Sequence, residues 1–424
     1  MKRILWLSGI ALGLWLGIYL WPHVDSSKEE QIQWPNLVSL NINRIIFKDF
    51  SLLNQTGKWK VRVKEQDFPA NKEEVESLLR FISQNKPKRV LDKINSDKWS
   101  QFGLNKDNSL VIEAEEKQIQ LILGGENPSQ DGVYALSNIL PNTLLLLPFD
   151  YEQELKKNPK DFYQLAVFPF TDEDLKKVQI EKKGQPYLVL KKGEKEDFQF
   201  LYPEEYKKEK VNSSEATSLF FNLATLKAQD LLYVDPKKLS PPLYTYTLEL
   251  KNLTSFSLQI YSYQDSNYLL KLDKNPWYYL LDQAGLNGIN KKPFLLKDRH
   301  FLNFAQEDVK RIELASPEKS LDIVYKDREK VWKVVGSGEE FSGASLYLWE
   351  LQDLEYLDII SKLPSDLSVV LSLTLKNKMN KDLVDVEFFS TKDEDKFWVK
   401  IAEDRYYLVQ TDLVKNLTSK LKEN

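Results

Sequence analysis

The chain has 424 residues, of which 42% are hydrophobic and 12% aromatic, so it is long and apolar enough to form several folded units. Its 59 lysines and arginines nearly balance its 63 aspartates and glutamates. This balance argues against a nucleic-acid-binding protein, which needs a clustered basic surplus. The absence of cysteine excludes disulfides, thiolate metal sites and cysteine nucleophiles.

An apolar segment behind a basic start is the first predicted element. No charged residue occurs between Arg3 and Asp25, and residues 4–21 would span roughly 27 Å as a helix, enough to cross the hydrocarbon core of a bilayer. The bulky sequence that follows lacks a good cleavage site, which favours an uncleaved signal anchor at 1–24 over a removed signal peptide. Basic residues before the helix predict a cytoplasmic N-terminus at a bacterial inner membrane, with a tether at 25–40 and the rest of the chain in the periplasm.

The predicted membrane helix carries Gly9, Gly13 and Gly17 on one face. Small residues at this spacing let two membrane helices approach closely, so the three glycines are a candidate contact face for a membrane partner. The alternative is that glycine is simply frequent in membrane helices.

Three copies of one unit follow the tether. Each opens with two alternating strands, predicted over 43–48 and 58–63, 176–181 and 197–202, and 310–315 and 331–336. An amphipathic helix comes next, with apolar residues at i, i+3, i+4 and i+7 in each copy: Val75, Leu78, Leu79 and Ile82; Ala216, Leu219, Phe220 and Leu223; Ala344, Tyr347, Leu348 and Leu351. Asn71 and Asn212 are predicted to cap the first two helices, and Ser342 the third.

Four alternating strands separated by polar turns complete each copy. Each copy therefore predicts β-β-α followed by a four-strand meander, an arrangement in which a helix covers one face of a mainly antiparallel sheet. The predicted fold class is α+β, with one N-terminal transmembrane helix followed by three tandem related domains at 41–168, 169–304 and 305–424.

Several short motifs are similar to those of a known family: GKW at 57–59, FGLN at 102–105, LILGG at 121–125, GVYAL at 132–136, and LLKDRHFLNFAQEDVKRIEL at 295–314. With these motifs the chain resembles domain-of-unknown-function family 4340 over most of residues 40–424. The resemblance implies a membrane-anchored extracytoplasmic protein associated with a gliding-motility-type ABC transporter, with a permease, an ATPase or other envelope proteins as partners. It implies no catalytic residues.

No motif for reaction chemistry is present in the sequence. The two histidines, His23 and His300, lie outside any HExxH or HxxxH pattern, and no GxSxG or phosphate-binding glycine motif occurs. We therefore predict no catalytic residue, no metal and no cofactor. The acidic runs at 171–175 and 392–396 are typical of solvated loops, although the sequence leaves open a hydrolase whose two carboxylates meet in space.

The stretch GGENPSQDGVY at 124–134 is the candidate functional loop, and its candidate residues are Gly124, Gly125, Asn127, Asp131, Gly132 and Tyr134. Its glycines and polar residues could expose backbone groups to a ligand. A long hairpin connection explains the same residues. Tryptophans and tyrosine pairs elsewhere could stack on sugars, whereas core packing is the usual role of aromatic residues on strands.

These observations predict a non-enzymatic, membrane-anchored, extracytoplasmic accessory or scaffold subunit of an ABC-type transport or gliding-motility-like complex. The alternative is an extracytoplasmic binding module for a glycan or another exported polymer.

Overall fold

The computed structural model describes residues 34–115, 117–194, 197–364, 367–402 and 405–423. The predicted signal anchor at 1–24, with Gly9, Gly13 and Gly17, lies outside these residues, as does most of the predicted tether. No helix in the described part of the chain is long and apolar enough to cross a membrane.

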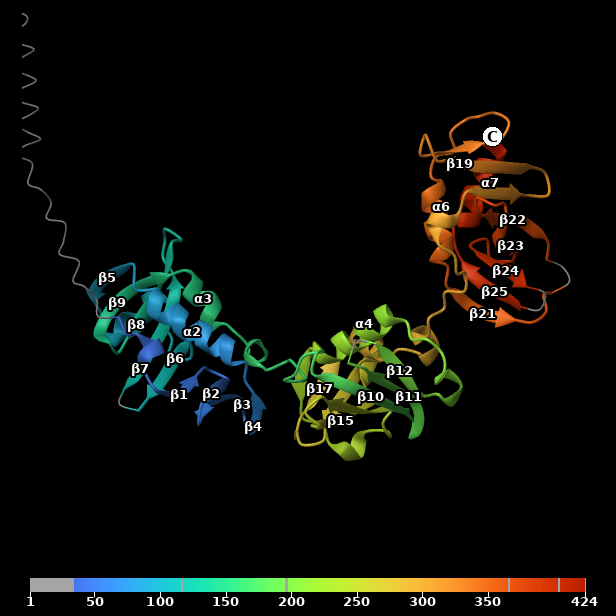
Figure 1. Ribbon diagram of the computed structural model, residues 1–424. Coiled ribbons are helices and arrows are strands. Elements are labelled where there is room, and N and C mark those ends of the chain that lie inside the picture. Colours follow the sequence, from blue (N-terminus) through green and yellow to red (C-terminus); the bar gives the residue numbers. More distant parts are fainter. Residues whose placement is uncertain (1–33, 116, 195–196, 365–366, 403–404, 424) are drawn as a thin grey trace, which may run out of the picture. The chain divides into compact units, whose positions relative to one another are not determined.

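Nine strands form the first sheet in the order β4-β3-β2-β1-β6-β7-β8-β9-β5 (Figure 1). Their bounds are β1 Ile42–Ile46, β2 Phe50–Gln55, β3 Lys58–Val63, β4 Gln66–Pro69, β5 Arg89–Lys93, β6 Ser109–Ala114, β7 Gln118–Glu126, β8 Gly132–Ser137 and β9 Leu140–Pro148. Antiparallel pairing of β1 with β6 joins the opening strands to the meander, and it sets buried Ile45 opposite buried Ile112. The alternating apolar residues of these strands thus face one core.

Helix α2 (Lys72–Gln84) lies across one face of the first sheet, and α3 (Asp150–Leu155) ends this copy (Figure 1). Asn71 caps α2, because its Oδ1 atom accepts a hydrogen bond from the Glu73 backbone N–H at 3.0 Å. The four predicted apolar residues of this helix are all buried: Val75, Leu78, Leu79 and Ile82. Each such burial stabilises the fold by about 1.5–3 kcal/mol, so one helical stripe holds the helix on the sheet.

The second and third sheets have eight strands each and repeat the same order, β12-β11-β10-β14-β15-β16-β17-β13 and β20-β19-β18-β22-β23-β24-β25-β21. The second contains β10 Leu175–Lys182, β11 Gln185–Lys192, β12 Phe198–Tyr202, β13 Asp230–Leu232, β14 Tyr244–Leu250, β15 Ser255–Ser262, β16 Tyr268–Leu272 and β17 Tyr278–Leu281. The third contains β18 Arg311–Ala315, β19 Ser320–Lys326, β20 Val331–Val334, β21 Tyr356–Ile360, β22 Val369–Lys376, β23 Asp382–Ser390, β24 Lys396–Ala402 and β25 Arg405–Gln410.

The helices of these copies are α4 (Ser213–Ala224), α5 (Gln283–Ile289), α6 (Ala344–Gln352) and α7 (Leu413–Glu423). Asn212 caps α4 by accepting a hydrogen bond from the Glu215 N–H at 3.2 Å. The predicted cap of α6 is wrong: Gly343 occupies the N-cap with a φ of 85°, and no side chain caps the helix. Glycine tolerates this left-handed backbone, whereas serine adopts it rarely.

Each copy also contains an opening strand that was not predicted from the sequence. These strands are β2, β11 and β19, and the first copy adds β4, so three or four strands precede the main helix where two were predicted. Strand β11 alternates buried and partly exposed residues, which is the signal that was overlooked. An apolar pair follows each main helix and lies on an edge strand: Val90 and Leu91 on β5, Leu231 and Leu232 on β13, and Ile359 and Ile360 on β21.

The predicted fold class is wrong as stated. The described chain is built mainly from antiparallel sheets, its helices are few and short, and none of them qualifies as the predicted transmembrane helix. Most of the chain forms strands because apolar and polar residues alternate with a period of two, also in segments that were predicted to be turns or loops.

The chain divides into two compact units. Of the described residues, one unit holds those up to Pro169 with Thr225–Leu243 and Leu258–Leu286, and the other holds those of Phe170–Ala224, Tyr244–Ser257 and the chain from Asn287 onward. The three predicted domain limits stay a prediction.

Candidate functional site

The predicted loop at 124–134 is the hairpin between β7 and β8, and Asn127 organises it. Its Oδ1 atom accepts hydrogen bonds from the backbone N–H groups of Asp131 and Gly132, both at 3.1 Å, and its Nδ2 atom donates to Asp131 Oδ1 at 2.6 Å. The hydrogen bond from Asn127 lowers the pKa of the Asp131 carboxyl, and Lys88 acts in the same direction. The side chains of Asn127 and Asp131 are therefore engaged with each other.

The glycines of this hairpin lie where two backbones approach closely. A Cβ atom on Gly124 would lie 2.3 Å from the Phe102 carbonyl oxygen, and one on Gly132 would lie 2.4 Å from that of Leu147. Gly125 packs against Gly103, and the Tyr134 ring contacts the Phe102 ring edge-on at 5.0 Å. Packing against the FGLN turn and, for Gly132, against β9 thus accounts for these residue types, and ligand binding by the loop stays a prediction.

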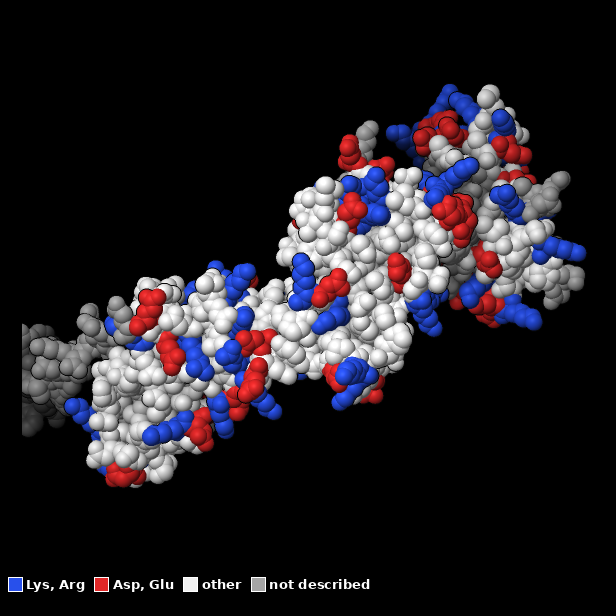
Figure 2. All heavy atoms as spheres, turned by 90° about the horizontal axis from the view of Figure 1, so that it is seen from below, with Lys and Arg blue, Asp and Glu red and all other residues white. Residues whose placement is uncertain are grey.

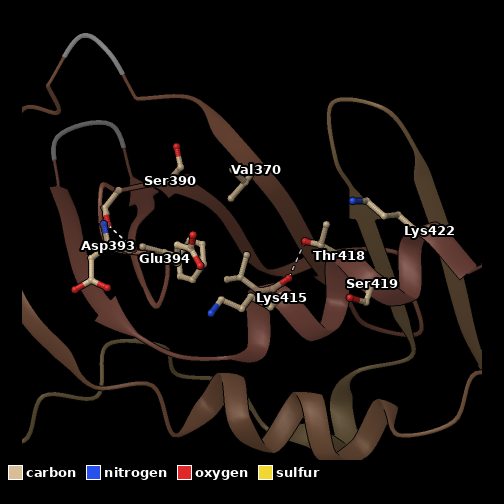
Figure 3. Close-up of a pocket in the computed structure, with 11 residues that line it drawn as sticks. Val370, Ser390, Asp393, Glu394, Lys415, Thr418, Ser419 and Lys422 are labelled. Atoms are coloured by element: carbon tan, nitrogen blue, oxygen red, sulfur yellow. Dashed lines mark hydrogen bonds between the residues drawn. The ribbon is translucent and has the colours of Figure 1, made fainter.

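A cavity of about 370 Å³ lies between α7 and the neighbouring strands of the third sheet (Figure 3). Val370, Phe397 and Val414 supply its apolar wall. Its other lining residues are hydroxyl-bearing or charged: Ser390, Thr391, Asp393, Glu394, Lys415, Thr418, Ser419 and Lys422. Residues 392–395 of the acidic run are exposed, as predicted for a solvated loop, and Asp393 and Glu394 also line this cavity.

Two of the charged residues that line this cavity, Asp393 and Lys415, form ion pairs. Lys396 Nζ donates to Asp393 Oδ2 at 2.6 Å, which lowers the pKa of the Asp393 carboxyl. Lys415 forms an ion pair with Asp395, and that hydrogen bond raises the pKa of the Lys415 ammonium. Thr418 donates its hydroxyl to the Val414 carbonyl at 2.7 Å, as Figure 3 shows. The side chains of Asp393, Lys415 and Thr418 are thus held in place by neighbouring groups.

His300 lies between two carboxylates. Its Nδ1 atom is 2.6 Å from Asp298 Oδ1 and its Nε2 atom 3.6 Å from Asp353 Oδ1. Among the described residues, no group of three histidine, cysteine, aspartate or glutamate side chains could hold a metal ion.

Two linkers have the same backbone pattern. In the first linker, residues 163–168, the Gln164 N–H donates to the Pro69 carbonyl at 2.9 Å, and the Leu165 carbonyl accepts from the Ala228 N–H at 2.9 Å. In the second linker, residues 297–302, the Asp298 N–H donates to the Lys210 carbonyl at 2.8 Å. The Arg299 carbonyl of this linker accepts a hydrogen bond from the Tyr356 N–H at 3.1 Å. Each linker is thus hydrogen-bonded to two segments that precede and follow it in sequence.

Aromatic side chains surround the first linker. Phe162 is fully buried, with its ring centroid 5.6 Å from that of Phe47 and 5.8 Å from that of Phe50. Tyr163 is nearly buried and lies 4.8 Å from Phe68. Burial, with a contribution from Asp230, raises the pKa of the Tyr163 hydroxyl to about 12.

Ion pairs surround the second linker. Arg299 is buried and pairs with Glu355, and its Nη1 atom also donates to the Tyr356 carbonyl at 3.0 Å. Lys210 Nζ lies 2.8 Å from Asp298 Oδ2. Burial raises the pKa of the Asp298 carboxyl, but hydrogen bonds from Lys210 and His300 outweigh it, so the pKa lies below its usual range.

Charged side chains of both signs are intermingled on the face shown in Figure 2. Acidic and basic groups lie next to each other there, so this face has no broad basic surface of the kind that nucleic acid requires. The prediction that the chain binds no nucleic acid rests on this balance and stays a prediction.

The comparison with protein families gives a match over residues 59–248, to a family described as "Domain of unknown function (DUF4340)". This part of the chain therefore matches a domain-of-unknown-function family. No curated protein matches the chain.

Solved structures similar to this chain include the DNA polymerase III subunit beta from Pseudomonas aeruginosa, at 9% identity, 88% coverage of this chain, 92% of that chain and a TM-score of 0.14. Another is BBS1N in complex with ARL6DN, at 6% identity, 85% and 87% coverage and a TM-score of 0.11. TM-scores this low carry no argument about fold or function.

Proposed function

We propose that the protein is a non-enzymatic accessory or scaffold subunit of an ABC-type transport or gliding-motility-like complex in the bacterial envelope. The observation that carries the proposal is the pair of hydrogen-bonded linkers. A linker whose backbone bonds to folded segments has less conformational freedom than a flexible tether. The segments around each linker therefore form an ordered surface that a partner protein can bind, which a scaffold needs.

The family match supports the proposal at a coarser level. Residues 59–248 match a domain-of-unknown-function family, and the resemblance stated above associates such proteins with ABC transport systems. The proposal places most of the chain outside the cytoplasm at the inner membrane, with a permease or an ATPase as partner. Protease added to intact spheroplasts should degrade the chain if this placement is correct, and protection of the whole chain contradicts it.

Affinity purification of the tagged full-length protein, followed by mass spectrometry, tests the scaffold role. We expect an ABC permease and its ATPase among the recovered proteins. Gln164→Pro removes the N–H that donates to Pro69 and should lower their recovery. Gln164→Ala keeps that N–H and should not. Recovery of the wild-type protein without any transport subunit contradicts the proposal.

A further inference from the structure

A second groove, of about 630 Å³, lies beside α6 within the unit that also contains α4. Four segments line it: the start of α4, the second linker, the chain from the end of α6 into β21, and the end of β25. Its size falls in the range of small-molecule sites. Neither the candidate loop nor the cavity of Figure 3 shares a residue with it.

Trp349 is the aromatic side chain of this groove, and it is 54% exposed. Trp59 and Trp332, which lie on strands, are each only 8% exposed. Tryptophan contributes a large apolar face that proteins normally bury, so an exposed indole at the wall of a groove is available for stacking. Trp349 lies four residues before Asp353, and this spacing places the two residues on one face at the end of α6.

Free hydrogen-bonding groups share the groove with this indole. Ser214, Glu350 and Gln410 line it, and among the described residues their side chains have no hydrogen-bond or ion-pair partner. Other lining groups are already fixed in place: the Asn212 Nδ2 atom donates to Glu355 Oε1 at 2.9 Å, and Glu355 also pairs with buried Arg299. The groove therefore contains polar side chains that are held by hydrogen bonds and ion pairs, and others whose donors and acceptors are available to a ligand.

The charges of the groove narrow the class of ligand. Its carboxylates are Glu215, Glu350, Asp353 and Glu355, and the cations paired with them are Lys291 for Glu215 and Arg299 for Glu355. Among the described residues, Glu350 and Asp353 have no lysine or arginine partner, and Asp353 lies 3.6 Å from the Nε2 atom of His300, which also lines the groove. The carboxylates therefore outnumber the lysine and arginine cations at the groove, which disfavours an anionic ligand. Because Glu215 and Glu355 are already paired with cations, we expect hydrogen bonds to contribute more than charge to the binding of a ligand in this groove.

We propose that this groove binds an uncharged saccharide. A pyranose ring has an apolar C–H face that stacks on an indole, and a rim of hydroxyl groups that both donate and accept hydrogen bonds. Trp349 provides the stacking surface, Glu350 accepts from hydroxyl groups, and Ser214 and Gln410 donate and accept. This site goes beyond the scaffold role and favours the alternative function, the binding of an exported glycan.

Calorimetric titration of the full-length protein with neutral oligosaccharides tests the proposal. The probes are cellohexaose and chitohexaose, with oligogalacturonate as the anionic counterpart and chitosan hexamer as the cationic one, in buffer free of alkyl-glycoside detergent. We expect a neutral probe to bind with a Kd below about 1 mM, and oligogalacturonate to bind at least about tenfold more weakly. No binding of either neutral probe, or binding of the chitosan hexamer more than about tenfold tighter than both, overturns the assignment.

Variants on the same helix locate the site. Trp349→Ala should weaken binding at least about tenfold, and Trp349→Phe should retain most of it because an aromatic face remains. Leu346→Ala is the matched control, since Leu346 is 55% exposed on α6 and does not line the groove. Equal affinity of Trp349→Ala and the wild type contradicts the proposal. Recovery of transport subunits with Trp349→Ala is a separate readout, so failure of this site leaves the scaffold proposal standing.

Discussion

The first and second linkers form equivalent backbone hydrogen bonds with side chains of opposite character. Aromatic rings enclose the first, where Phe162 and Tyr163 are buried, and ion pairs enclose the second, where Arg299 is buried against Glu355. At matching positions, Gln164 stands where the second linker has Asp298. The backbone hydrogen bonds are thus common to both linkers, whereas the surrounding side chains determine which substitutions and which pH destabilise each linker.

Phe162→Ala should produce the largest loss, because it removes a fully buried ring that contacts Phe47 and Phe50. We expect about 4 kcal/mol less local stability for β1 and β2, measured by native-state hydrogen exchange. The matched variant is Leu296→Ala at the start of the second linker, where Leu296 is also fully buried. It should cost about 3 kcal/mol, because a smaller side chain is lost. A loss below about 1 kcal/mol for Phe162→Ala would show that its rings do not hold the first linker.

Glu355→Ala should produce the next largest loss. It leaves the guanidinium of Arg299 buried, with the side chain 8% exposed, and it also removes the acceptor of the Asn212 amide. We expect about 2 kcal/mol less local stability around β21 by hydrogen exchange.

Lys227→Ala is the control for that variant. Lys227 forms the backbone bridge of the first linker at the position that Glu355 holds in the second, and its side chain is exposed. Its loss should be below about 0.5 kcal/mol. Equal losses for the two variants would mean that ion pairing adds nothing to the second linker.

The sequence predicted the repeat, the apolar stripe of α2 and the Asn71 and Asn212 caps, because each is a local pattern of side chains. It missed β11 and β19 although both strands carry the alternating pattern. It also missed β2, whose first three residues are all buried, and the left-handed Gly343 cap, because neither follows a simple periodic pattern. The groove beside α6 could not be predicted from the sequence for a different reason. Its walls come from segments as far apart in sequence as Asn212 and Thr411, and only the fold brings them together.

Alkaline pH should weaken the first linker through Tyr163. Burial raises the pKa of its hydroxyl to about 12, whereas an unfolded tyrosine titrates near pH 10. The unfolded state therefore loses its proton first, and the stability contributed by Tyr163 is complete below about pH 10 and is lost as the pH rises toward about 12. Tyr163→Phe should remove this part of the alkaline loss in thermal unfolding. Identical alkaline curves for the variant and the wild type would contradict this assignment.

Acidic pH should weaken the second linker by a smaller amount, through Asp298. The pKa of its carboxyl lies below the usual range because Lys210 and His300 hydrogen-bond to it more strongly than burial disfavours the charge. A lowered pKa in the folded state contributes stability that is present above the unfolded value of about 4 and is lost as the pH falls through the folded value. Hydrogen exchange near Asp298, compared between the wild type and Asp298→Asn across this range, should show the acid loss only in the wild type. The first linker has Gln164 at this position and should show none, so an acid loss of equal size in both linkers would mean that Asp298 is not its source.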